Sequence, residues 1–279
     1  FLFEAQPRAT WSRDLIFTIE LVNHFDAHLS AIYLKNDTLY SPYTAKAVSV
    51  ERYKRLQSDQ DQHSISLEKE FNALTKAHKL ANTKCEWRNV NVPGHDIIPA
   101  FIRHARYTDL SVMGHIGDDH SLDQSIIANT VIKSGRPVLL LPDERGHLEV
   151  LKGGVAVVGW DGSRGAVRAL HDAIPLLKRM DETILVCVDG HKNEDVNQSL
   201  PGADIAPLIH RYGLKVSVEQ THSEGRSVEQ CLNLKLKECS AKLLIIGAFS
   251  NTYSIIDRLF GSTCTNMIEK NHIPIFISH

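Results

Sequence analysis

The sequence has 279 residues, of which 43% are hydrophobic and 23% are charged, so it is long enough for two domains with cores of ordinary size. Its net charge of −2 argues against a protein built to bind nucleic acid or an anionic membrane. No apolar run approaches the roughly 20 residues of a membrane helix. The cysteines are scattered without a C-x-x-C pair, which predicts reduced thiols and a cytoplasmic protein.

The first half of the chain alternates between strand and helix patterns. Apolar residues at helical spacing predict helices, and short apolar or alternating runs predict strands. In chain order these are a strand at 1–3, a helix at 11–25, a strand at 28–34, a helical region at 44–80 interrupted at 58–62, a strand at 87–92, a helix at 97–105 with Asp96 as N-cap, a strand at 109–113, and a helix that leads into a strand at 137–141.

A polar stretch with Pro and Gly, residues 142–153, separates this half from a second series of the same kind. The predicted domains are therefore 1–142 and 154–279, joined by a linker at 143–153. The second half predicts strands at 155–160, 183–188, 214–219, 243–246 and 274–277, with helices at 164–180, 204–212 and 227–239 and another that starts at 261.

The two halves also repeat each other in sequence. The run DLSVMG at 109–114 matches KLLIIG at 242–247, and RPVLL at 136–140 matches IPIFI at 273–277. Strands that alternate with helices require right-handed crossovers and therefore form a parallel sheet. The sequence predicts an α/β protein of two tandem, doubly wound, Rossmann-like parallel-sheet domains.

Polar and glycine residues follow three strands of the second half. Asp161 follows the first strand, Gly247 ends the fourth, and Gly261-Ser262-Thr263 opens the last helix. Ligands of open α/β sheets bind at the carboxyl ends of the strands, and a helix N-terminus favours phosphate. Each feature alone also has an ordinary structural explanation, namely a turn aspartate, a strand-end glycine and a helix N-cap.

The stretch from Gly247 to Ser262 resembles the nucleotide loop of the universal stress protein family, whose pattern is G-x2-G-x9-G-[ST]. This chain reads Gly247-x2-Ser250-x10-Gly261-Ser262, with serine in place of the second glycine and a last spacer that is one residue longer. The resemblance covers nearly the whole chain, strongly in residues 153–279 and weakly in 1–142.

The resemblance implies a set of contacts to ATP or a related adenine nucleotide, accompanied by Mg²⁺. Asp161 would contact the adenine or ribose, and the backbone of Val188 would meet the adenine edge. Gly247 would admit the ribose and phosphates, with Ser250 near them. The distal phosphates would be held by three consecutive residues, Gly261, Ser262 and Thr263. The expected function is nucleotide-dependent regulation of the stress response, with little or no turnover.

The first half keeps Gly114-x2-Gly117 but lacks the rest of the loop. The position that corresponds to Gly261 is Gln124, and the loop before it carries acidic residues that would repel phosphate. This half is therefore interpreted as a degenerate copy that packs, dimerises or regulates.

Alternative functions remain open at this point. The sequence contains no Walker lysine and no G-x-S-x-G elbow, so neither a P-loop NTPase nor a serine hydrolase is predicted. One alternative is an interaction or dimerisation scaffold without nucleotide, in which Ser250 and the longer spacer have closed the pocket. A second is a slow ATPase, and a third, remoter one is another α/β nucleotide binder such as an electron-transfer flavoprotein subunit.

Overall fold

A computed structural model describes residues 1–5, 10–37, 49–93, 96–114, 121–142, 150, 152–189, 204–248, 267–268 and 272–279. The chain divides into two compact units, which are treated separately below. Unit 1 contains Phe1–Gly114 and Ser121–Arg136, and unit 2 contains Pro137–His279. Residues 137–142, which were predicted to end the first domain, belong to the second compact unit. No helix in the described ranges is long and apolar enough to cross a bilayer.

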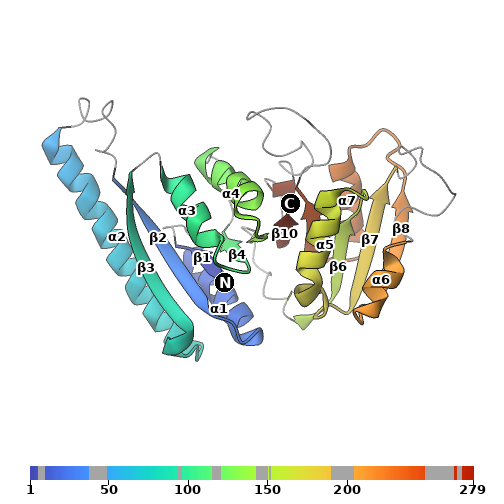
Figure 1. Cartoon of the computed structure of the whole chain (residues 1–279), viewed down its shortest axis with the longest axis horizontal. Coiled ribbons are helices and arrows are strands. Elements are labelled where there is room, and N and C mark those ends of the chain that lie inside the picture. The colour runs from blue at the N-terminus through green and yellow to red at the C-terminus, as the bar shows by residue number, and fades with distance from the viewer. Residues whose placement is uncertain are drawn as a thin grey trace. The chain divides into compact units, whose positions relative to one another are not determined.

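Unit 1 is a parallel sheet with the strand order β3-β2-β1-β4. Its elements are β1 (Leu2–Glu4), α1 (Trp11–His24), β2 (Leu29–Asp37), α2 (Val50–Ala77), the short 3-10 turn η2 (Asn82–Lys84), β3 (Cys85–Pro93), α3 (Ile97–Ala105), β4 (Ser111–Met113) and α4 (Ser121–Ser134). Because the strand order reverses direction at β1, crossovers on either side place helices on opposite faces. Accordingly α1 packs against α2, and α3 packs against α4 (Figure 1).

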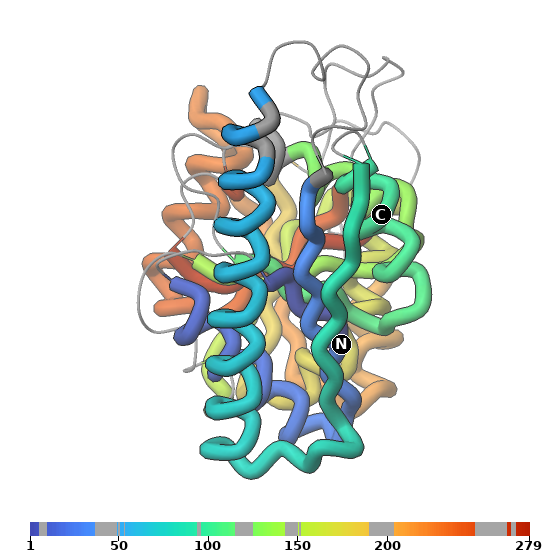
Figure 2. The backbone as a smooth tube through the Cα atoms, turned by 90° about the vertical axis from the view of Figure 1, so that its left-hand side faces the viewer, coloured from blue at the N-terminus to red at the C-terminus, as the bar shows by residue number. Residues whose placement is uncertain are grey.

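The long helix α2 differs from its prediction. It runs without a break through its 28 residues, so the predicted interruption at 58–62 is wrong. That stretch is polar but contains neither Gly nor Pro, and polarity alone does not end a helix. Figure 2 shows α2 running beside β2 and β3, which it contacts. Its buried side chains there include Leu67 and Phe71.

Two further details of unit 1 depart from expectation. The strand β2 extends to Asp37, beyond the predicted end at 34. Its pairing with β3 accounts for the greater length, because the register runs as far as Asp37 opposite Pro93. Asp96 occupies the N-cap position of α3, as expected, but its side chain makes no capping hydrogen bond.

Unit 2 has the strand order β5-β10-β9-β6-β7-β8. Its elements are β5 (Val138–Leu140), β6 (Val155–Gly159), α5 (Arg164–Leu177), β7 (Glu182–Val188), α6 (Ala206–Arg211), β8 (Val216–Thr221), α7 (Val228–Glu238), β9 (Leu243–Gly247) and β10 (Ile275–Ser278). The ladders are parallel except that β5 and β10 run antiparallel. The sequence predicted a wholly parallel sheet, and the β5–β10 pair is the exception among the described strands of this unit. The repeat pattern locates the strands along the chain but does not determine which strands pair or in which direction.

Small residues bring α5 close to the sheet. Its buried face contains Ala166, Ala169, Leu170, Ala173 and Leu177, and it packs on β9 and β10 as well as β6. The narrow alanine face shortens the distance between helix and strand axes. This close packing positions the first turn of α5 beside the end of β9.

Candidate functional site

Three predicted site residues come together at the carboxyl edge of unit 2. Gly247 ends β9, Asp161 follows β6, and Val188 ends β7, and these strands are neighbours in the order β9-β6-β7. The strand order reverses direction at β6, because the chain leaves β6 toward β7 on one side and β9 lies on the other. Such a reversal point is where open α/β sheets bind ligands.

Asp161 forms a turn that leads into α5. Its Oδ1 atom accepts a hydrogen bond of 2.9 Å from the backbone N–H of Ser163. The Ser163 hydroxyl in turn caps α5 by accepting from the N–H of Ala166 at 3.2 Å. The structural explanation for an aspartate here is therefore real. Asp161 is nevertheless exposed, and its turn uses only Oδ1, so Oδ2 can accept a hydrogen bond from a ligand hydroxyl.

Gly247 is needed for packing. A Cβ atom at Gly247 would lie 2.4 Å from both the backbone N of Ala166 and the carbonyl C of Gly165. A Cβ atom at Gly165 would lie 2.8 Å from the carbonyl O of Ala248. The two glycines thus let the first turn of α5 touch the end of β9. Sequence reasoning assigned Gly247 to a ligand and missed Gly165, whose only signal is its place two residues after the Ser163 cap.

Arg164 and His279 also lie at this edge, and sequence reasoning missed both. The Nη2 atom of Arg164 lies 3.4 Å from Nε2 of His279, and Nδ1 of His279 lies 2.9 Å from the carbonyl O of Ala248. Arg164 is exposed and opens α5, whose first turn contains no acidic residue. A guanidinium and a helix N-terminus with no acidic side chain in its first turn both favour an anion at this edge.

Val188 extends beyond the strand pairing that β7 shares with β6. The β6–β7 ladder ends with Gly159 opposite Val186, two residues before Val188. On its other side Val188 pairs with Thr221 of β8. The half-buried Val188 therefore lies at the rim of the sheet, and the next residue, Asp189, has a positive φ of 50°.

Beneath this rim lies the buried thiol of Cys187. Burial, together with the negative charge of Asp161, raises the pKa of Cys187 to about 11. The thiol is therefore protonated at neutral pH and is not a nucleophile. All four cysteines in the described part of the chain have free thiols.

The remaining predicted site residues cannot be placed. Ser250, Gly261, Ser262 and Thr263 lie outside the described residues, as does Gly117 of the first half. Their roles stay predictions. The described parts of the chain contain no group of three side chains suited to hold a metal ion.

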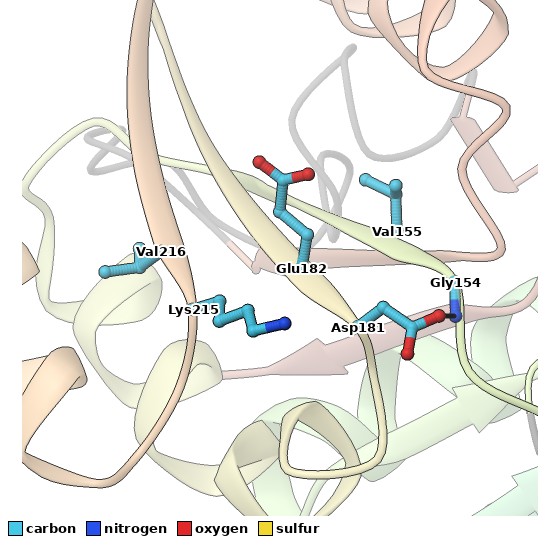
Figure 3. Close-up of a pocket in the computed structure, with 6 residues that line it drawn as sticks. All are labelled: Gly154, Val155, Asp181, Glu182, Lys215 and Val216. Carbon is cyan, nitrogen blue, oxygen red and sulfur yellow. Dashed lines mark hydrogen bonds between the residues drawn. The ribbon is translucent and has the colours of Figure 1, made fainter.

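A surface depression of about 410 Å³ lies at the opposite, amino edge of unit 2. It is lined by the starts of β6, β7 and β8, with Gly154, Asp181, Glu182 and Lys215 among its residues (Figure 3). The dashed line in Figure 3 is the 2.7 Å hydrogen bond from the N–H of Gly154 to Oδ2 of Asp181. That carboxylate fixes the chain where it enters β6, so the depression has a structural explanation and is not the candidate site.

Comparisons with solved structures identify the fold. A universal stress protein from Archaeoglobus fulgidus superposes with a TM-score of 0.74 at 16% identity, over 99% of this chain and 95% of that one. A putative universal stress protein from Pseudomonas aeruginosa gives 0.55 at 12%, over 99% and 91%. The chain has the universal stress protein fold. The resemblance stated from the loop residues is thus confirmed at the level of the fold.

The same fold also serves in another setting. The cytoplasmic domain of a prokaryotic cation chloride cotransporter superposes with a TM-score of 0.50 at 11% identity, over 99% of this chain and 93% of that one. No protein-family model matches the sequence. No curated protein matches it either.

Proposed function

We propose that unit 2 binds an adenine nucleotide, ATP or a close relative, at the carboxyl edge of β9, β6 and β7. The observation that supports this most is the convergence of Asp161, Val188 and Gly247 at the reversal point of the strand order. The three residues come from the ends of three separate strands, and the resemblance implies a role for each of them in nucleotide binding. The universal stress protein fold supports the same proposal.

In this proposal each described residue has a distinct task. The Oδ2 atom of Asp161 accepts a hydrogen bond from a ribose hydroxyl, while Oδ1 accepts the hydrogen bond from Ser163 that forms the turn. Gly247 lets the ligand and the first turn of α5 approach the same strand end. Arg164 adds positive charge for the phosphates, and Mg²⁺ would be held mainly by those phosphates, since magnesium sites commonly use only one or two protein carboxylates. The predicted loop residues from Ser250 to Thr263 would complete the phosphate contacts.

The proposed role is regulatory, in a cytoplasmic stress response and with little or no turnover. A bound nucleotide would stabilise unit 2 and order its carboxyl edge, which a partner protein or a second copy of the chain could then recognise. The described free thiols agree with a reducing compartment.

The direct test is the nucleotide content of the purified protein, followed by thermal unfolding with added nucleotide. We expect an adenine nucleotide near one per chain, or a melting temperature that rises with ATP. A ligand at a hundred times its dissociation constant stabilises the folded state by about 2.7 kcal/mol. The proposal would be contradicted if the purified protein contained no nucleotide and its melting temperature did not change with ATP, ADP or AMP.

The charge of Arg164 provides a sharper test at the site. We expect Arg164→Glu to weaken ATP binding by about tenfold at low salt, because it reverses a charge beside the phosphates. Lys178→Glu makes the same charge change at the other end of α5 and should leave binding within about twofold. Equal affinities for the two variants, measured by isothermal titration, would remove Arg164 from the site.

A second candidate is an interaction scaffold that binds no nucleotide. It is favoured by Ser250, which replaces the second glycine of the loop pattern, and by the appearance of this fold in a transporter's cytoplasmic domain. The nucleotide-content measurement separates the two candidates. A slow ATPase would instead release phosphate over many turnovers, and Gly261→Val with an intact fold should abolish that release.

A further inference from the structure

A compact basic surface lies on unit 1, at the ends of α3 and α4. It consists of Arg103, Arg106, Tyr107, Lys133 and Arg136, and is called the Tyr107 patch below. Tyr107 is 89% exposed, the most exposed of the large hydrophobic side chains in the described part of the chain. The four basic residues are exposed as well. A single exposed aromatic residue is ordinary by itself, but one that accompanies four exposed basic side chains is a combination typical of binding surfaces.

Two contacts join the end of α3 to the end of α4 within the patch. The guanidinium of Arg106 donates from Nε and Nη2 to the carbonyl O of Lys133, at 3.3 and 3.2 Å, which joins the end of α3 to the end of α4. Arg136 lies 3.6 Å from the carboxylate of Asp109, an exposed pair that links the segment after α3 to the segment after α4. Tyr107 lies in sequence between the two linked positions.

The net charge of the patch is positive. Asp109 is the only acidic residue in the segments 103–110 and 133–136, against the four basic side chains. His104 adds nothing at neutral pH, because its burial and the nearby charges of Arg88 and Arg103 lower its pKa. Guanidinium and ammonium groups stay charged throughout the physiological range, so the patch keeps its charge there.

Helix electrostatics account for part of this surface. Arg103 lies in the last turn of α3 and Lys133 in the last turn of α4, where cations compensate the negative helix ends. That explanation does not require an exposed tyrosine, nor a second basic residue after each helix. Tyrosine and arginine are the residues in which binding energy at protein interfaces concentrates.

We propose that the Tyr107 patch is a docking surface for an acidic segment of a partner protein. Charge complementarity selects the acidic partner, and Tyr107 supplies an apolar contact. Single-stranded nucleic acid fits less well, because such sites stack successive bases on several aromatic side chains along a groove. The described patch has one aromatic residue. The proposal concerns unit 1 and does not depend on nucleotide binding by unit 2.

The test uses the full chain and a fluorescein-labelled glutamate-rich peptide with one central tryptophan, followed by fluorescence anisotropy. We expect salt-sensitive binding that Arg103→Glu or Lys133→Glu weakens by about tenfold at low salt. Tyr107→Ser should weaken it by a similar factor, about tenfold, with less dependence on salt. Lys69→Glu, the same charge reversal on the exposed face of α2, should leave affinity within about twofold.

Several outcomes would overturn the proposal. They are no binding of the peptide to the wild-type chain, an equal loss in Lys69→Glu and Arg103→Glu, or full affinity in Tyr107→Ser. Tighter binding of oligothymidylate than of the peptide would also overturn it and would assign the patch to nucleic acid. Because all of these side chains are exposed, unchanged melting temperatures will show that the variants fold.

Discussion

The two units begin their first helices in contrasting ways. In unit 1 the first turn of α1 contains Asp14, which is 2% exposed and accepts hydrogen bonds from Thr10 and Arg13. In unit 2 the first turn of α5 contains no acidic residue and starts with Arg164. A helix N-terminus attracts negative charge. Unit 1 has a buried carboxylate in that first turn, whereas unit 2 has none there and only the exposed Asp161 ahead of the helix.

The strand ends differ in the same sense. Unit 1 closes β1 with Glu4, a buried carboxylate that is 4% exposed, and fills the space beside α1 with Trp11 against Phe3 and Trp87. Unit 2 ends β6 with Gly159, and the exposed Asp161 lies two residues further on. The comparison teaches that, among the described residues, the first strand and first helix carry buried carboxylates in unit 1 and an exposed one between them in unit 2. The predictions below test this contrast.

The largest effect is expected for Gly247→Ala. The added methyl carbon would lie 2.4 Å from two backbone atoms of α5, and backbone cannot move aside as a flexible side chain can. We expect a loss of unfolding free energy of about 3 kcal/mol, measured in urea, with faster hydrogen exchange in α5 and β9.

Gly159→Ala is the matched control, since Gly159 ends the neighbouring strand β6. Its added carbon would meet side-chain atoms at 3.4 Å or more, an ordinary contact. The cost should stay below about 1 kcal/mol. Similar costs for the two glycines would mean that α5 does not touch β9 as described.

Asp14→Asn should be the next largest. Asparagine keeps the shape but loses the charge that Thr10 and Arg13 contact, and the site is buried. We expect the unfolding free energy of unit 1 to fall by about 2 kcal/mol, because hydrogen bonds to a buried charged group are among the stronger ones. Nucleotide binding should be unchanged. A neutral result in urea unfolding would show that this carboxylate is not what satisfies α1.

The same substitution in unit 2, Asp161→Asn, should behave in the opposite way. Asparagine can still accept from the N–H of Ser163, so stability should change by less than about 0.5 kcal/mol. ATP affinity should fall by about tenfold, since the charged acceptor for the ligand is lost. Isothermal titration beside urea unfolding measures both quantities. Unchanged affinity would place the ligand away from this strand end.

Strand ends could be predicted from the sequence, whereas contacts between distant elements could not. Apolar runs that stop at Gly247 and Asp161 predicted the strands, their ends and their shared edge, because that information is local. The contact between Gly247 and Gly165 was beyond reach, since it depends on which strand α5 packs against. The antiparallel β5–β10 pair could not be predicted either, because it depends on which strands become neighbours in the fold.

Errors of the other kind came from treating polarity as a helix breaker. Residues 58–62 lie within a continuous α2, because the helix needs only its buried stripe of side chains such as Leu67 and Phe71. Arg164 and Tyr107 carried no periodic signal at all. Their significance comes from exposure and from their neighbours in space, which only the folded chain provides.

The smallest predicted effect concerns pH and the thiol of Cys187. Its pKa is raised in the folded protein from an ordinary 9.0 to about 11, first by burial and then by Asp161. A raised folded pKa means that the stabilising contribution is complete below the unfolded pKa and is lost as pH rises toward the folded one. Between about pH 8 and about pH 10 the loss should approach 1 kcal/mol.

Other groups titrate in the same range, so the informative quantity is the difference between wild type and Cys187→Ala in urea unfolding. The variant should lose less stability on that pH rise. Asp161→Asn should show an intermediate slope, because it removes the nearby negative charge but not the burial. Parallel slopes for wild type and Cys187→Ala would contradict the shift. A slope in Asp161→Asn equal to that of wild type would instead mean that the Asp161 carboxylate does not affect the pKa of the Cys187 thiol. Water at this exposed edge would then screen the charge of Asp161 from the thiol.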